Sequence, residues 1–201
     1  MATVNQIPPA AFFTTQQFYA ISCVNVGIGP GGMTSMLARI AVVDLDGNSI
    51  LDTYVMPTME VIDYRTATTG IQAAHLSPGN AVAFDVVQQH VATIIQGNIL
   101  VGHSIWNDLS VLGLAHPAFD IRDVALYQPF RNAVQCSNNI FSLQTLSLRL
   151  RNRIFLEGGR NPLENARGAG VLYLLDGVDW EAAIGGGNWP CALPPCPSNY
   201  L

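Results

Sequence analysis

A glycine-rich segment is the first feature of the sequence that could do chemistry. Residues Gly27 to Gly32 fit the G-x-G-x-x-G pattern of loops that hold the pyrophosphate of a dinucleotide. Such a loop must open a helix, because the helix N-terminus binds the phosphates. Here the loop leads into an apolar, β-prone run at 36–43, and Pro30 removes one amide donor. The sequence therefore predicts a turn between two strands and no nucleotide site in this loop.

Basic residues are the second candidate for chemistry, because they neutralise the phosphates of nucleic acids. Four of the nine basic residues lie close together in sequence: Arg149, Arg151, Arg153 and Arg160. This cluster also fits the polar face and last turn of a helix. The chain has no lysine, a net charge of −5 and only 11% charged residues. Since a nucleic-acid binder usually carries a basic patch, the charge balance argues against a nucleic-acid partner.

The composition also constrains the surface and the location of the protein. Hydrophobic residues make up 49% of the chain, which fits a homo-oligomer or an apolar ligand pocket. A surface rich in uncharged polar residues would explain the low charge equally well. We find neither a signal peptide at the N-terminus nor an apolar run of about 18 residues that could span a membrane. We therefore expect a protein without membrane contact in the cytoplasm, with the nucleus left open.

The elements that must position any site follow from hydrophobic periodicity. Apolar, β-prone runs predict three strands at 18–26, 36–45 and 49–55, and Asp46-Gly47 indicates a hairpin between the last two. Further apolar patterns predict helices at 80–96, 105–114, 141–152 and 162–175, with strands at 98–101 and 121–126. This order gives an α/β domain whose mixed sheet begins with three antiparallel strands and is flanked by helices. We divide the chain into a lead-in at 1–16, a domain at 17–176 and a Gly/Pro-rich tail at 177–201.

Several ordered segments of the chain resemble one family. Residues 20–27, the glycine loop and residues 37–39 resemble the opening of DEDDh-type exonucleases, in the RNA exonuclease branch that includes the interferon-stimulated exonuclease. The D-Y-R-T segment at 63–66 and the segment V-G-H-S-I-W-N-D-L at 101–109 resemble that branch as well, and residues 161–168 stand where its third motif falls. The resemblance covers about residues 17–176 and implies a ribonuclease H-like fold.

The resemblance also implies a two-metal centre held by four carboxylates, with a histidine as general base. Carried over position by position, the four acids fall on Ser22, Val24, Asp108 and Asn165, and the histidine falls on Arg160. One of these five positions keeps the family's residue type. We therefore expect a degenerate exonuclease without metal or cofactor. We also expect Asp108 and Arg160 to form an ion pair, because a partly buried carboxylate needs a partner.

The remaining polar residues at these positions define the candidate site. We assign catalytic roles to Asp108, His103 and Arg160. Substrate contacts are assigned to Ser22, Val24, Met33, Trp106, Asn107, Asn165, Tyr64 and Arg65. Structural interpretations stay open: His103 could hold its turn, Trp106 could pack in the core, and Asp108 could be an acid at a helix start. Tyr64 and Arg65 could likewise be structural residues of their loop.

Three functions are compatible with such a site. The first is a metal-free enzyme of small-molecule biosynthesis, such as an isomerase, a cyclase or a condensing enzyme, that acts on an apolar metabolite. The second is a pseudo-exonuclease that serves as a non-catalytic protein-interaction module. The third is residual nucleic-acid binding or exonuclease activity. We prefer the first, and an open polar cleft would favour it over the second, for which we expect a plugged cleft.

Overall fold

The structure is a computed structural model that describes residues 16–135, 140–151 and 161–195. Its centre is a six-stranded mixed sheet with the order β3-β2-β1-β5-β6, to which β4 adds by pairing with β1. The strands are β1 (Phe18–Ile28), β2 (Thr34–Asp44), β3 (Ser49–Tyr54), β4 (Val61–Asp63), β5 (Ile99–Gly102) and β6 (Ile121–Asp123). The first three pair antiparallel, whereas β5 and β6 run parallel to β1. The predicted α/β class with an antiparallel start is confirmed.

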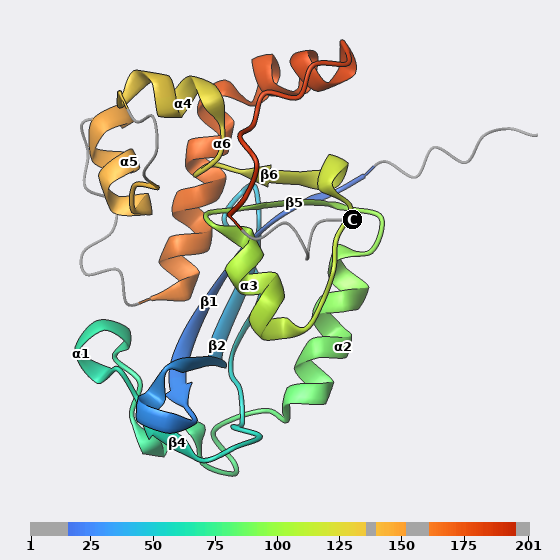
Figure 1. Cartoon of the computed structure of the whole chain (residues 1–201). Coiled ribbons are helices and arrows are strands. Elements are labelled where there is room, and N and C mark those ends of the chain that lie inside the picture. Colours follow the sequence, from blue (N-terminus) through green and yellow to red (C-terminus); the bar gives the residue numbers. More distant parts are fainter. Residues whose placement is uncertain (1–15, 136–139, 152–160, 196–201) are drawn as a thin grey trace, which may run out of the picture.

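Helices cover both faces of this sheet (Figure 1). On one face, α2 (Phe84–Ile95) and α3 (Ile105–Leu112) pack on apolar side chains of β1, β2 and β5. On the other face lies α6 (Pro162–Gly185), together with the shorter α4 (Gln128–Ala133) and α5 (Leu143–Arg151). A four-residue helix, α1 (Thr66–Thr69), follows β4. Among the described residues, no helix is long and apolar enough to cross a membrane.

The glycine-rich segment forms the turn between β1 and β2, as its context predicted. Gly29, Gly31 and Gly32 all have positive φ, a conformation that side chains with a Cβ rarely adopt. Gly27 is required for a different reason, because a Cβ at this position would lie 2.3 Å from the carbonyl oxygen of Gly32. The segment therefore makes a tight backbone contact, forms one short 3-10 turn at Pro30–Gly32 and leads into β2 instead of an α-helix.

Helix α6 is longer than the sequence predicted. The apolar pattern predicted an end at residue 175, but the helix continues to Gly185, and both Trp180 and Ile184 are buried in the core. Trp180 stacks on Tyr127 with ring centroids 3.8 Å apart, so tertiary packing outweighs the low helix propensity of the glycines in this segment. Helix α2 is shorter than predicted and begins at Phe84, because Val82 pairs with Val55 and donates to the carbonyl oxygen of Tyr54.

Candidate functional site

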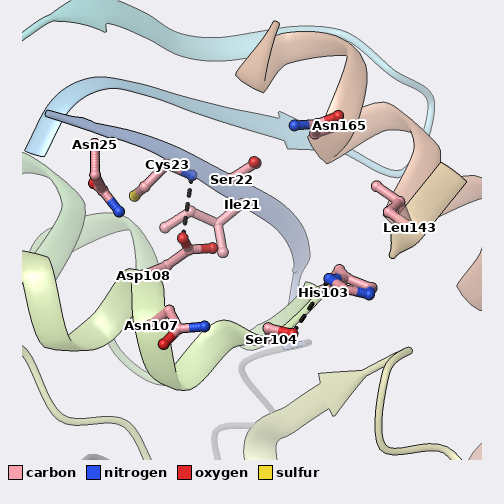
Figure 2. Close-up of a pocket in the computed structure, with 10 residues that line it drawn as sticks. All are labelled: Ile21, Ser22, Cys23, Asn25, His103, Ser104, Asn107, Asp108, Leu143 and Asn165. Carbon is pink, nitrogen blue, oxygen red and sulfur yellow. Dashed lines mark hydrogen bonds between the residues drawn. The ribbon is translucent and has the colours of Figure 1, made fainter. Parts of the chain in front are cut away.

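A cleft opens where the middle of β1 has a free edge. Strand β5 pairs with β1 only as far as Ile21, and β4 joins that edge again at Gly27. Between these points, residues from both faces of the strand can reach the same space. The cleft has a volume of about 340 Å³. Its lining residues are Ile21, Ser22, Cys23, Asn25, His103, Ser104, Asn107, Asp108, Leu143 and Asn165 (Figure 2).

Asp123, at the end of β6, holds the start of α3 in place. Its carboxylate accepts the backbone N–H groups of Ser104 at 2.9 Å and Ile105 at 2.8 Å, and that of Ala125 at 3.0 Å. Burial raises the pKa of Asp123, while the neighbouring His103 lowers it. Because α3 carries Asn107 and Asp108 into the cleft, Asp123 is a positioning residue for both. Asp123 was not among the site residues predicted from the sequence.

Asp108 is buried against β1, with 7% of its surface exposed. The backbone N–H of Cys23 donates to its carboxylate at 3.3 Å. Burial raises the pKa of Asp108 well above its usual range, and the charge of Asp123 adds to this effect. The pKa of the Cys23 thiol is raised as well, first by burial and then by Asp108, so this thiol stays protonated and is a poor nucleophile.

His103 connects the cleft to the segment before α5. Its Nε2 lies 2.7 Å from the carbonyl oxygen of Phe141, which only accepts, so Nε2 carries a proton. Its Nδ1 lies 3.3 Å from the hydroxyl of Ser104. Both ring nitrogens therefore have partners within the protein. This geometry supports the structural interpretation of His103, and its catalytic role stays a prediction.

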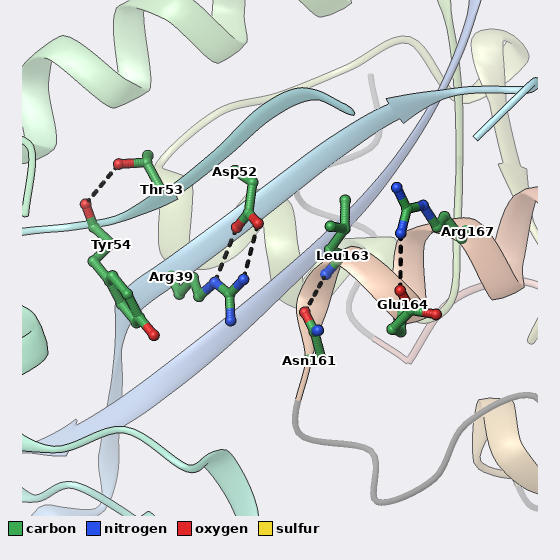
Figure 3. Close-up of polar contacts among 8 residues, drawn as sticks. All are labelled: Arg39, Asp52, Thr53, Tyr54, Asn161, Leu163, Glu164 and Arg167. Carbon is green, nitrogen blue, oxygen red and sulfur yellow. Dashed lines mark hydrogen bonds and ion pairs between the residues drawn. The ribbon is translucent and has the colours of Figure 1, made fainter. Parts of the chain in front are cut away.

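The first turn of α6 brings Asn165 to the opposite wall of the cleft. The side chain of Asn161 caps this helix by accepting the backbone N–H of Leu163 at 3.0 Å (Figure 3). One turn later, Arg167 donates to the carbonyl oxygen of Gly47 at 3.0 Å and fixes the helix to the β2–β3 hairpin. In Figure 2, the side chain of Ser22 extends from β1 toward the first turn of α6, which carries Asn165.

The structure brings together part of the predicted site. Ser22, His103, Asn107, Asp108 and Asn165 all line the cleft. The other predicted residues that the structure describes lie outside its lining, and they are Val24, Met33, Trp106, Tyr64 and Arg65. Arg160 lies outside the described residues, and so does its expected ion pair with Asp108.

The residues outside the lining have structural surroundings. Val24 is buried in an apolar cluster under the β1–β2 turn, Trp106 is buried on α3, and Met33 is 84% exposed at the turn. Tyr64 packs against the same apolar cluster as Val24. Arg65 donates to the carbonyl oxygen of Gly32 and to the hydroxyl of Ser35, each at 3.0 Å, so it holds the glycine turn.

A second cavity of about 610 Å³ extends the cleft along α3. It is lined by Asn25, Thr34, Ser35, Asn107, Ser110 and Val111, so it shares both asparagines with the first cavity. The carbonyl oxygen Oδ1 of Asn25 is buried without a hydrogen-bond partner in the described structure. Apart from Asp108 and the imidazole of His103, the described lining of the two cavities has no ionisable group other than the Cys23 thiol. The combined groove therefore offers hydrogen bonds rather than ion pairs.

This donor set does not fit two divalent metal ions. Mg²⁺ and Mn²⁺ prefer oxygen ligands, carboxylates above all. In the described part of the chain, no group of three or more histidine, cysteine or acidic residues could hold a metal ion. Asp108 is the one carboxylate among the described residues that line the cleft.

Comparisons with known proteins place the chain among exonucleases. No family model matches the sequence. RNA exonuclease 4 of Mus musculus is 36% identical over 192 residues, which cover 96% of this chain and 44% of the mouse protein. RNA exonuclease 4 of Xenopus tropicalis is 40% identical over 174 residues, which cover 87% of this chain and 41% of that protein. The chain thus spans less than half the length of these two relatives.

Solved structures agree with the sequence comparison. The chain is similar to the pseudoubiquitin hydrolase–RNA exonuclease module of Saccharomyces cerevisiae Pan2 in complex with AACCAA RNA. The TM-score is 0.71 at 27% identity, and the match covers 84% of this chain and 30% of the Pan2 chain. The ribonuclease H-like exonuclease fold that the motifs implied is therefore confirmed.

These comparisons correct two sequence-based predictions. The preferred function, an isomerase-like enzyme of small-molecule biosynthesis, is wrong because the relatives are RNA exonucleases, and the interaction-module alternative gains no support. The expectation that nucleic acid is not a partner is also wrong, since a structural neighbour holds RNA. That expectation assumed recognition through lysine and arginine, although single-stranded RNA is also recognised by hydrogen bonds to its bases and 2′-hydroxyls. By sequence and by structure, this chain belongs to the exonuclease family that includes RNA exonuclease 4.

Proposed function

We propose that this chain binds single-stranded RNA in the groove along β1 and α3, and that it hydrolyses the strand far more slowly than a complete two-metal centre would. The observation that carries the proposal is the groove itself. It is open and lined by asparagine, serine and threonine side chains, in a chain related to RNA exonucleases. RNA as the ligand also fits an intracellular place of action, in the cytoplasm or the nucleus.

The lining chemistry supports a single strand as the ligand. Bases of single-stranded RNA are accessible for hydrogen bonding on their edges, and each ribose adds a 2′-hydroxyl that both donates and accepts. Asn25 and Asn107 stand where the two cavities join, and each amide carries two donors and an acceptor oxygen. The groove can therefore hold sugars and bases without neutralising many phosphates.

We expect slow hydrolysis because the described lining of this cleft has too few carboxylates for a two-metal centre. In a two-metal mechanism, the ions stabilise both the attacking and the leaving oxygen of the displaced phosphate. Ser22 and Asn165 stand at two of the acid positions that the family resemblance implies, and Val24 stands at a third. A hydroxyl, an amide and an isopropyl group supply no negative charge to hold such ions.

The binding claim is tested by fluorescence anisotropy with an end-labelled RNA hexamer in EDTA. Asn107→Leu keeps the side-chain size and removes the hydrogen bonds, which are worth about 1 kcal/mol each. We expect it to weaken binding about fivefold. The matched control Asn132→Leu changes an exposed asparagine on α4 that is not among the lining residues of either cavity, and it should leave affinity unchanged. Equal effects of the two variants would contradict the assignment of the groove.

The claim about the metal centre has its own test. The double variant Ser22→Asp/Asn165→Asp adds two carboxylates beside Asp108. We expect Mn²⁺ to raise the melting temperature of this variant and to leave that of the wild type unchanged. A control variant with acids at the exposed positions Ser49 and Asn132 should not respond. A wild type that Mn²⁺ stabilises as strongly as the double variant would refute the claim.

A further inference from the structure

An apolar cavity lies beside β6 and shares no lining residue with the RNA groove. It has a volume of about 200 Å³. Its walls are residues around β6 and the segment that follows α6, and they are Ala118, Ile121, Asp123, Leu126, Trp189, Cys191, Ala192, Leu193 and Pro194. Seven of the nine are apolar, and the partly buried Cys191 thiol behaves as a small apolar group. The cavity therefore lacks the hydrogen-bonding lining of the groove.

The wall after α6 is fixed by backbone hydrogen bonds. The N–H of Gln128 donates to the carbonyl oxygen of Pro190 at 2.8 Å, and the N–H of Ala192 donates to that of Leu126 at 2.8 Å. Between these bonds, Tyr127 and Cys191 form an antiparallel bridge. The segment is thus attached like a short strand, and the cavity has a defined shape.

Aromatic side chains stand at this cavity. Trp189 lines it and is 41% exposed, which is unusual for so large an apolar side chain. Its ring lies 6.5 Å from that of Phe119, which is also exposed. Burial raises the pKa of Cys191 to about 12, so its thiol adds no charge to the wall. The one carboxylate in the lining is Asp123, which is buried.

We propose that this cavity is a binding site for a compact, uncharged aromatic ring. An apolar cavity of about 150 Å³ in another protein stays dry and binds benzene, so the present volume suits one ring system of benzene to indole size. The ring of such a ligand could make offset-stacked or edge-to-face contacts with Trp189, which would stabilise binding. A charged ring is excluded, because its desolvation is unfavourable and an anion would also be repelled by Asp123.

The site is connected to the groove through one residue. Asp123 lies in the wall of the cavity and also accepts the N–H groups at the start of α3. The binding claim itself does not depend on RNA recognition, so its test uses the protein without RNA.

The test is a thermal shift titration of the full chain with indole, with benzoate as a charged comparison. At tenfold excess over its dissociation constant, indole should raise the melting temperature by about 4 °C, and benzoate should not. Ala118→Leu and Ala192→Leu fill the cavity and should each abolish the shift, whereas Ala133→Leu on the exposed face of α4 should keep it.

N-acetyl-tryptophanamide distinguishes two sources of the ring. A shift with this probe as well as indole assigns the site to a tryptophan side chain presented by a peptide, and a shift with indole alone assigns it to a free small molecule. No shift with indole at millimolar concentration would overturn the proposal. A shift in Ala118→Leu and Ala192→Leu as large as that of the wild type would also overturn it, because indole would then bind elsewhere.

Discussion

Removing the carboxylate of Glu181 should destabilise the protein strongly, because it leaves a buried charge behind. Arg122 is 2% exposed and donates to Glu181 through Nε at 2.6 Å and Nη2 at 2.8 Å. Tyr173 donates to the same carboxylate at 2.9 Å. This network joins β6 to the part of α6 that the sequence analysis did not predict. Replacing Glu181 therefore tests whether that part of the helix is integral to the fold.

The magnitude follows from the bonds lost. Breaking a buried ion pair by removing one partner typically costs about 3–5 kcal/mol. We expect the lower end for Glu181→Ala, because Nη1 of Arg122 keeps the carbonyl oxygens of Phe119 and Ile121 as acceptors. Glu181 itself is also 34% exposed. A loss of about 3 kcal/mol corresponds to a fall in melting temperature of roughly 6–12 °C for a chain of this size.

The assay is urea unfolding followed by circular dichroism, with Glu164→Ala as the matched control on the same helix. Glu164 pairs with Arg167 at 2.9 Å on the surface (Figure 3), and such exposed pairs contribute about 0–1 kcal/mol. If Glu181→Ala costs no more than Glu164→Ala, the reasoning about the buried network is refuted. The double variant Arg122→Met/Glu181→Ala should recover part of the loss, since no buried charge is left unpaired.

Three further predictions concern pH, the glycine turn and salt. Burial works to raise the pKa of Glu181, but the hydrogen bonds and charge of Arg122 lower it overall. The ionised carboxylate therefore stabilises the fold above its unfolded pKa of about 4.3, and this contribution is lost as the pH falls through the lower folded pKa. The difference in unfolding free energy between the wild type and Glu181→Gln, measured by urea unfolding, should therefore disappear in acid. Gly27→Ala should cost about 1–3 kcal/mol because its Cβ would clash with Gly32, whereas Gly185→Ala, with open space around it, should be nearly neutral in the same experiment. RNA affinity, measured by anisotropy between 50 and 200 mM salt, should fall less than about tenfold, because the groove makes few phosphate contacts, and a fall of about a thousandfold would indicate an ionic interface.

The early part of the fold was predictable because its patterns are local. The apolar runs and the Asp46-Gly47 turn predicted β1 to β3 within a few residues. The end of α6 was not predictable, because Gly177 and the later glycines disfavour a helix locally, and what holds it is the stacking of Trp180 and the ion pair of Glu181. Those contacts join residues far apart in sequence.

The site was predictable only in part, and for a geometric reason. Family motifs located Ser22, Asp108 and Asn165, all of which line the cleft. Asn25 was missed, since alternate residues of a strand normally face opposite sides of a sheet. Because β5 stops pairing with β1 at Ile21, side chains from both faces of β1 beyond that residue reach the same cleft. The sequence does not show where this pairing ends.

One native gel can show whether the groove binds RNA without cutting it. The wild type is incubated in excess with an end-labelled single-stranded RNA in Mn²⁺, and the RNA is recovered from the shifted band and sized. We expect a shifted band that contains full-length RNA. Shortened RNA would show that the chain recruits acids beyond the described cleft lining, and the absence of a shifted band would show that the groove does not bind RNA.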